Sequence, residues 1–152
     1  MYNKIEGFAR WFSYKLHLQD KFQKNNLIHF KVNRGDIYTC YFGENIGYEK
    51  SRLEARPSIV ISTDDINHES GNVIVVPMSK NIKWSKKYPH RLKYDWNYVL
   101  YKKKYPKLAC DSMIQCEDIR CVSKIRLGKY IDHLDDIDRK NLKKRIKRAL
   151  QV

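Results

Sequence analysis

Between residues 80 and 110 the chain alternates aromatic and basic side chains in a way that suits nucleic-acid binding. This stretch holds ten Lys or Arg residues against one Asp. Aromatic rings can stack on unpaired bases, while Lys and Arg side chains follow the phosphates. The candidates near its start are Lys80, Lys83, Trp84, Lys86 and Lys87. The alternative is that about half of the aromatic rings belong to strands or to the core.

A second candidate is Arg56, which stands where a long polar stretch enters an apolar segment. Its guanidinium could pair with two phosphate oxygens and would keep its charge at neutral pH. The following residue, Pro57, restricts Arg56 to an extended backbone. Taken alone, the pattern favours an ordinary surface arginine in front of a strand.

The composition of the whole chain indicates a polyanionic partner. The 152 residues include 31 Lys and Arg against 17 Asp and Glu, for a formal net charge of +14. A basic solvated surface without such a partner is the alternative. No run approaches the roughly 18 apolar residues of a membrane span, and residues 1–18 lack the apolar region of a signal peptide. We therefore expect a cytoplasmic protein with no membrane partner.

The four cysteines do not predict a metal site. They lack C-x-x-C spacing and have no histidines at zinc-finger distance. In a cytoplasmic chain their thiols stay reduced, so we interpret them as small, buried or half-buried side chains: Cys40, Cys110, Cys116 and Cys121. We expect neither a metal nor a cofactor.

The first element that must position these groups is an N-terminal helix within residues 1–32. Asn3 can cap it, and it should end near Asn25 and Asn26. Its apolar stripe at helical spacing consists of Ile5, Phe8, Ala9, Phe12 and Leu16, and Trp11 and Phe22 widen this face. We predict that this helix packs on the body or on a partner, with a membrane-surface helix as the alternative.

Residues 33–152 are predicted to form one domain built mainly of strands. Near-continuous apolar runs at 58–63 and 72–77, together with 37–42, suit strands buried on both faces. Weaker strand candidates are 90–94, 112–115 and 121–125. Residues 43–55 should be a long, exposed loop, and turn signals at 63–65 and 70–72 mark a loop between two strands. Asp135 or Asp136 can cap a C-terminal helix whose buried stripe includes Leu142.

Four strings in the second part of the chain occur in a characteristic order. They are 34–38 (RGDIY), 47–49 (GYE) followed by 56–62 (RPSIVIS), 75–79 (VVPMS) and 111–120 (DSMIQCEDIR). In this order and at this spacing, the chain resembles the MazF/PemK family of toxin ribonucleases over about residues 34–150.

The resemblance implies an α+β fold, a small SH3-like antiparallel β-barrel with a C-terminal helix, to which this chain adds the N-terminal helix. It implies the toxin of a type II toxin–antitoxin system: a metal-independent endoribonuclease that cuts single-stranded RNA at specific sequences. The 2′-hydroxyl attacks the phosphate and leaves a cyclic phosphate and a 5′-hydroxyl. It further implies a cognate antitoxin, a homodimer, and DNA binding only through the antitoxin complex.

The resemblance also assigns residues. Arg56 and Ser79 match the family's catalytic arginine and threonine, and Glu49 and Glu117 match two acidic positions. Either carboxylate could accept the 2′-hydroxyl proton, and the sequence does not choose between them. Lys50 and Arg52, beside Glu49, are further RNA-binding candidates.

The chain departs from the family pattern at three places. Asp118 stands where the family normally has Gln, and the stretches between Glu49 and Arg56 and between Ser79 and Asp111 are longer than usual. These changes affect the expected RNA sequence preference more than the activity.

Two other functions fit the same fold, a gyrase poison and a non-catalytic RNA-binding module. Arg56, Ser79 and the basic aromatic segment favour the nuclease over the gyrase poison.

Overall fold

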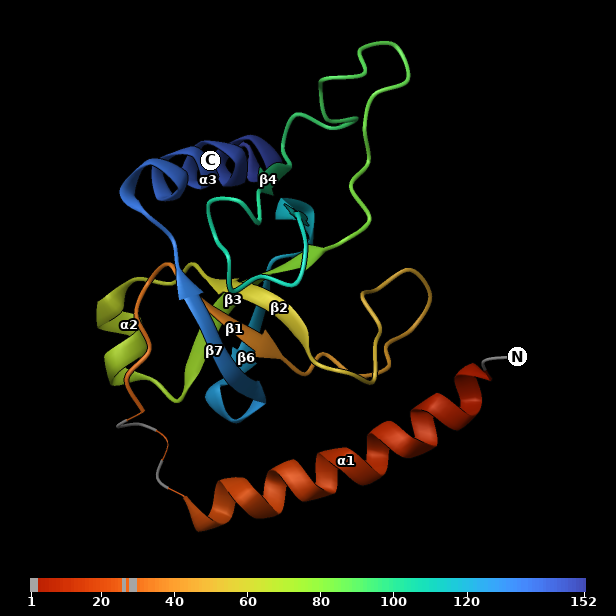
Figure 1. The fold of residues 1–152 in the computed structure, drawn as a ribbon. Coiled ribbons are helices and arrows are strands. Elements are labelled where there is room, and N and C mark those ends of the chain that lie inside the picture. The colour runs from red at the N-terminus through yellow and green to blue at the C-terminus, as the bar shows by residue number, and fades with distance from the viewer. Residues whose placement is uncertain (1–2, 26, 28–29) are drawn as a thin grey trace.

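The computed structural model describes residues 3–25, 27 and 30–152. Figure 1 shows a curled sheet with a long helix on either side of it. The elements in chain order are α1 (Lys4–Lys24), β1 (Asp36–Cys40), β2 (Arg56–Val60), α2 (Asp64–Glu69), β3 (Asn72–Ser79), β4 (Tyr98–Leu100), β5 (Ser112–Ile114), the 3-10 turn η1 (Cys116–Asp118), β6 (Arg120–Ser123), the 3-10 turn η2 (Lys124–Arg126), β7 (Leu127–His133) and α3 (Asp136–Leu150).

The strands form one antiparallel sheet in the order β4-β5-β3-β2-β1-β7. β3 is the central strand: β2 pairs along one edge, and the other edge is shared by β6 at its start and β5 at its end. The sheet curls into a half-barrel that carries α3 on one side (Figure 1). The predicted fold class, an α+β barrel-like sheet with a C-terminal and an N-terminal helix, is confirmed.

The two faces of the sheet are both buried, as the near-continuous apolar runs predicted. Ile59 and Val76 point into a core that α3 closes with Leu142. Their neighbours Val60 and Val75 point the other way, into a second apolar cluster. Successive side chains on a strand alternate between faces. In a run without polar residues, alternate side chains therefore pack into the two apolar clusters on opposite faces of the sheet.

The N-terminal helix packs on the body as predicted, but through Trp11 at the edge of the predicted apolar face and not through its central stripe. Asn3 caps it as expected, since the Asn3 side chain accepts a hydrogen bond from Ile5 N. The buried side chains are Trp11 and Leu18, two turns apart. The predicted stripe faces outward instead, with Ile5 78% exposed and Phe12 64% exposed. The side of the helix that carries the Trp11 indole contacts Gly43 in the loop after β1 and Arg126 of η2.

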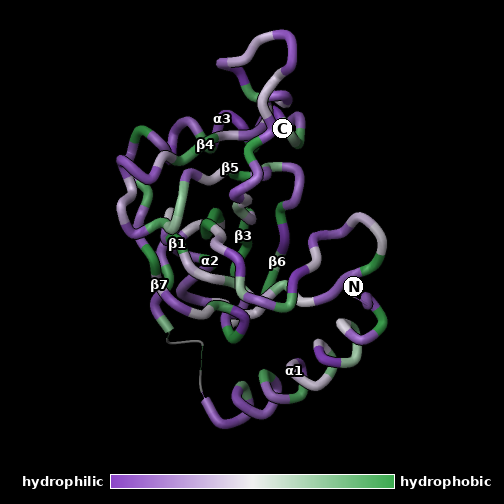
Figure 2. The backbone as a smooth tube through the Cα atoms, turned by 45° about the vertical axis from the view of Figure 1, so that its right-hand side comes forward, coloured by the Kyte–Doolittle hydropathy of each residue, from purple (hydrophilic) through white to green (hydrophobic). Residues whose placement is uncertain are grey.

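The helix ends at Lys24, with Asn25 as its cap, whereas Asn26 lies outside the described residues. Figure 2 shows hydrophobic positions interspersed with hydrophilic ones along the whole of α1. None of the helices in the described part of the chain has the length and apolar character needed to cross a bilayer.

Residues 43–55 form a loop as predicted, but Gly43 and Glu44 in it are buried and not exposed. Three further local predictions were wrong. Thr63 starts the short helix α2, where its hydroxyl accepts a hydrogen bond from Ile66 N, instead of opening a loop. Residues 90–94 form no strand, and only Leu92 makes an isolated bridge, to Trp84. Cys121 is exposed, not buried, because its position on β6 turns the side chain outward. The missing strand at 90–94 and the orientation of Cys121 depend on pairing between distant segments, which local patterns do not report. The Thr63 cap, by contrast, is a local contact with the N–H three residues later.

Candidate active site

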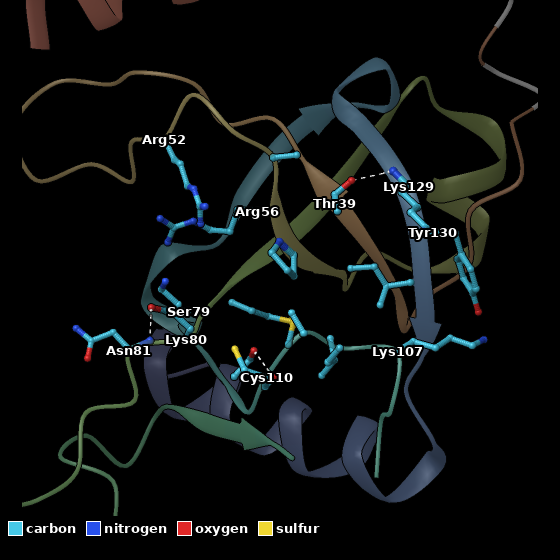
Figure 3. Close-up of a pocket in the computed structure, with 17 residues that line it drawn as sticks. Thr39, Arg52, Arg56, Ser79, Lys80, Asn81, Lys107, Cys110, Lys129 and Tyr130 are labelled. Atoms are coloured by element: carbon cyan, nitrogen blue, oxygen red, sulfur yellow. Dashed lines mark hydrogen bonds between the residues drawn. The ribbon is translucent and has the colours of Figure 1, made fainter. Parts of the chain in front are cut away.

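One pocket of about 860 Å³ opens where the ends of several strands meet (Figure 3). It lies between the start of β2, the end of β3, the segment before β5, and β7. The residues that line it are Thr39, Arg52, Ala55, Arg56, Pro57, Met78, Ser79, Lys80, Asn81, Lys107, Leu108, Ala109, Cys110, Ser112, Lys129, Tyr130 and Ile131.

The charge of this lining is of one sign. Five of its residues carry a positive charge, namely Arg52, Arg56, Lys80, Lys107 and Lys129. Among the described residues of the lining there is no Asp or Glu. Cations gathered around a partly apolar hollow strengthen one another's field toward an incoming anion. The pocket therefore suits a phosphate group.

Arg56 is fixed by its position in the sheet. It is the first residue of β2 and pairs with Cys40 of β1, and Pro57 after it keeps the backbone extended. Burial lowers the pKa of its guanidinium, and the positive charge of Arg52 lowers it further, while Asp118 opposes both effects. A guanidinium remains protonated at neutral pH even so. A bound anion would therefore reduce the repulsion between the Arg56 and Arg52 charges.

Arg52 reaches the same end of the pocket from the loop before β2 (Figure 3). Its Nε atom pairs with Glu54 Oε2 at 2.9 Å. Both side chains of this pair are largely exposed, so the pair itself holds Arg52 only weakly.

Ser79 occupies the last position of β3, where it pairs with Met113 of β5. Its Oγ atom accepts a hydrogen bond from the backbone N–H of Asn81 at 3.2 Å. A hydroxyl has one proton and two lone pairs, so this contact leaves the proton to be donated to an anion in the pocket. Arg56, Ser79 and Lys80 come together at one end of the pocket, as Figure 3 shows.

The two candidate carboxylates do not line the pocket. Glu49 lies exposed in the loop before β2, and its Oε2 atom accepts a hydrogen bond from Ile46 N at 3.2 Å. Glu117 is exposed in η1. Lys50 is also absent from the lining and instead pairs with Asp118 Oδ2 at 3.3 Å. Asp118, the departure from the family pattern, thus ties this loop to η1.

The other predicted RNA-binding residues after Lys80 also lie outside the pocket lining. Lys83, Trp84, Lys86 and Lys87 belong to a hairpin that projects from the body beyond the end of β3 (Figure 1). All four side chains are exposed.

Sequence reasoning missed the far end of the pocket, which Lys107, Lys129 and Tyr130 form. Lys129 is set by β7, where its backbone N–H donates to Thr39 Oγ1 at 2.8 Å. The neighbouring Gly128 permits this approach, because a Cβ atom there would lie 2.5 Å from the same oxygen. Lys107 belongs to the basic segment 80–110, but its spacing does not distinguish it, and no pattern marks Lys129.

In the described part of the chain, no group of three or more His, Cys, Asp or Glu side chains is placed to hold a metal ion. Two of the four cysteines are buried, Cys40 and Cys116, and burial raises the pKa of each thiol to about 12. They behave as core side chains.

Comparison with known proteins gives consistent results. A family model of the PemK-like, MazF-like toxins of type II toxin–antitoxin systems matches residues 33–150. Endoribonuclease EndoA of Bacillus subtilis (strain 168) is 31% identical over 121 residues, covering 80% of this chain and 92% of EndoA.

Solved structures show the same fold. MazF from Deinococcus radiodurans superposes with a TM-score of 0.62 at 15% identity, covering 80% of this chain and 97% of that one. An endoribonuclease from Mycobacterial species, solved in complex with its cognate antitoxin, gives a TM-score of 0.54 at 16% identity, with coverage of 80% and 95%. The family model and EndoA confirm the predicted endoribonuclease class. The chain belongs to the PemK-like, MazF-like toxins of type II toxin–antitoxin systems.

Proposed function

We propose that this toxin cuts single-stranded RNA at specific sequences without a metal ion, through attack of a 2′-hydroxyl on the adjacent phosphate. As the cyclic phosphate closes, the bond between phosphorus and the 5′-oxygen breaks, and that oxygen takes a proton from water to become a 5′-hydroxyl. The observation that best supports the proposal is the shared pocket of Arg56 and Ser79, with five cationic side chains and no carboxylate in its described lining.

In this mechanism the scissile phosphate sits at the Arg56 end of the pocket. The guanidinium pairs with two of its non-bridging oxygens, and the Ser79 hydroxyl donates its proton to one of them. Negative charge grows on these oxygens as the 2′-oxygen attacks, so preorganised donors stabilise the transition state more than the ground state. The rigid end of β3 and the start of β2 hold both groups in place for in-line attack.

The proton of the attacking hydroxyl passes to Glu49 or Glu117, the two carboxylates that the family pattern offers. Because neither lines the pocket, each would act through a bridging water or after a shift of its loop when RNA binds. Comparing Glu49→Gln with Glu117→Gln decides between them. The variant of the true base should lose its rate and the acidic limb of its pH–rate profile, whereas the other keeps both.

The remaining predicted residues bind the substrate chain. Lys50, Arg52 and Lys80 would contact phosphates next to the cut, and Lys83, Trp84, Lys86 and Lys87 would contact RNA farther along. Phosphate contacts position the substrate without reading its sequence.

The proposal includes the toxin's partners. One structural neighbour is an endoribonuclease held by its cognate antitoxin, and we extend that arrangement to this chain, with a homodimeric toxin in the cytoplasm. DNA would be contacted only through the antitoxin complex.

The test is to incubate purified protein with a long single-stranded RNA in EDTA, without ribosomes, and to map the new ends. We expect cyclic phosphate and 5′-hydroxyl termini at a short recurring sequence. Cleavage that disappears in EDTA would contradict the mechanism. RNA binding without any cleavage would favour the non-catalytic module.

A further inference from the structure

The hairpin of residues 82–94, here called the arm, is an ordered structure that the pocket does not use. Ser85 N donates to Arg91 O at 2.8 Å, Lys93 N donates to Lys83 O at 2.8 Å, and Trp84 and Leu92 form an isolated antiparallel bridge. The arm projects past the C-terminal end of α3 in both views (Figures 1 and 2). It is thus a hydrogen-bonded protrusion whose basic side chains are exposed.

The arm concentrates positive charge without counter-charge. Residues 82–94 contain five Lys or Arg and no Asp or Glu. None of these five forms an ion pair with any described residue. They are Lys83, Lys86, Lys87, Arg91 and Lys93. Like charges held together on a hairpin repel one another, and a bound polyanion removes that repulsion.

Exposed rings stand between these cations. Trp84 is 41% exposed and Tyr88 is 49% exposed. The Lys87 Nζ atom and the Arg91 guanidinium each lie 5.3 Å from the centre of the Tyr88 ring. Flat rings alternating with cations match the alternation of bases and phosphates in an unpaired strand. An acidic peptide would use the charges but leaves the rings without a partner.

The C-terminal half of α3 extends this basic surface. The backbone carbonyl of Asp95, at the base of the arm, accepts a hydrogen bond from Arg145 Nη1 at 2.5 Å, and the Asp95 carboxylate pairs with Arg148 Nε at 3.0 Å. Lys144 lies one turn before Arg148 on the same side of the helix and is exposed. The arm is therefore anchored to a second row of cations.

The arm is also joined to the pocket by the chain itself. Ser79, Lys80 and Asn81 line the pocket, and the arm begins at the next residue, Ile82. An RNA strand with one phosphate at Ser79 can therefore leave the pocket along Lys80 and continue onto the arm.

We propose that the arm and the C-terminal half of α3 form a second RNA-binding surface, which holds the single-stranded RNA flanking the cut sequence. This inference rests on the proposed function, because it assumes that the pocket takes the same RNA strand. It predicts that the protein binds long RNA more tightly than RNA that only fills the pocket.

The experiment compares two fluorescent 2′-O-methyl oligonucleotides, which lack the attacking hydroxyl. Both contain the mapped cut sequence, and they are about 8 and about 24 nucleotides long, below and above the reach of one binding surface. The arm variant is Lys86→Gln/Arg91→Gln/Lys93→Gln. Its matched control is Lys21→Gln/Lys31→Gln/Lys140→Gln, which removes the same net charge from exposed positions elsewhere.

We expect the arm variant to lose at least about 10-fold in affinity for the long probe and less than about twofold for the short one. Tyr88→Ala should weaken long-probe binding by about 10-fold through lost stacking, without changing its salt dependence. The control variant should affect both probes to the same small extent.

Two outcomes would overturn the inference: unchanged long-probe affinity in the arm variant, or equal losses in the arm and control variants. A polyglutamate peptide that loses binding in the arm variant, while RNA does not, would assign the arm to an acidic protein instead. Cleavage of unmodified RNA by the wild-type protein is measured separately. If the wild-type protein does not cleave RNA but still binds the long probe more tightly than the short one, the nuclease proposal is wrong and the proposed binding surface is retained.

Discussion

At the scale of single residues, Arg56 combines a half-buried position with a field of neighbouring cations. Replacing it with Ala removes the two-pronged contact to the phosphate, and we expect cleavage to fall by at least about 10²–10³-fold. Arg56→Lys keeps the charge but not the planar fork and should recover only part of the rate. Single-turnover cleavage measures both. Arg10→Ala, on the exposed side of α1, is the control, and full activity in Arg56→Ala would contradict the mechanism.

Ser79 offers a test in two directions. Ser79→Ala removes the donated proton and should slow cleavage by about 10²-fold. Ser79→Thr keeps the hydroxyl and adds a methyl group that restricts its rotamer, so activity should stay equal or rise. Rates are compared at saturating RNA, so that binding differences do not enter. A Thr variant as slow as the Ala variant would indicate that the hydroxyl does not act on the phosphate.

At the scale of elements, α1 braces the loop that carries Arg52. The Trp11 indole covers Gly43, where a Cβ atom would lie 1.9 Å from the ring, and Arg126 stacks on the same indole at 5.3 Å. Lys4 Nζ donates to Gly47 O at 3.2 Å. Only a glycine at φ +70° admits the ring here. The described residues of the extension 1–32 thus contribute no side chain to the pocket lining, but α1 supports the loop that forms one of its walls.

From this contact we predict the effect of loosening the loop. Trp11→Ala, or a chain that starts at Asn33, should still cut RNA but with a KM several-fold higher and a kcat changed less. Trp11→Phe should restore much of the affinity. Steady-state kinetics on one RNA separate the two constants, with Phe12→Ala on the exposed face as control. Complete loss of cleavage in a folded, truncated chain would refute the division into extension 1–32 and toxin domain 33–152.

The start of α3 depends on one buried carboxylate. Asp138 accepts hydrogen bonds from the hydroxyls of Tyr98 at 2.6 Å and Tyr105 at 2.5 Å, and Lys104 Nζ lies 2.7 Å away. Asp138→Ala would leave the hydroxyls of Tyr98 and Tyr105 without this hydrogen-bond acceptor, and we expect a loss of about 3 kcal/mol in the free energy of unfolding. Urea denaturation measures it. Asp136→Ala, exposed two residues earlier, should change stability by less than about 0.5 kcal/mol.

At the scale of the whole molecule, a net charge of +14 governs the encounter with RNA. Each phosphate neutralised on a single strand should lower log affinity by about 0.7 for each log unit of salt. We expect a slope that reports several phosphates for a long 2′-O-methyl probe in titrations at several salt concentrations. A neutral-backbone analogue of the same sequence should show almost none. A slope near zero for the charged probe would mean that the basic surfaces do not meet the phosphates.

Several features followed directly from the sequence because they depend on neighbours along the chain. The Asn3 and Asp135 caps formed as predicted. Strands such as β2 and β3 could be predicted because a short, unbroken apolar run between turn signals is typical of a buried strand. The order of the four motifs gave the family, and with it the expectation that Arg56 and Ser79 share a site.

The sequence by itself determined the family, the main strands and the basic character of the chain, whereas tertiary structure decided which groups meet. The apolar side chains of α1 spread over a wide face, and helical periodicity cannot tell which part of it packs. The helix packs through the side that carries Trp11, because Gly43 leaves room there for the indole ring. Likewise, the pocket joins five segments from Thr39 to Ile131 and admits Lys129 while leaving Glu49 outside. Such selections arise from shape and strand pairing between residues far apart in the chain, which no local pattern encodes.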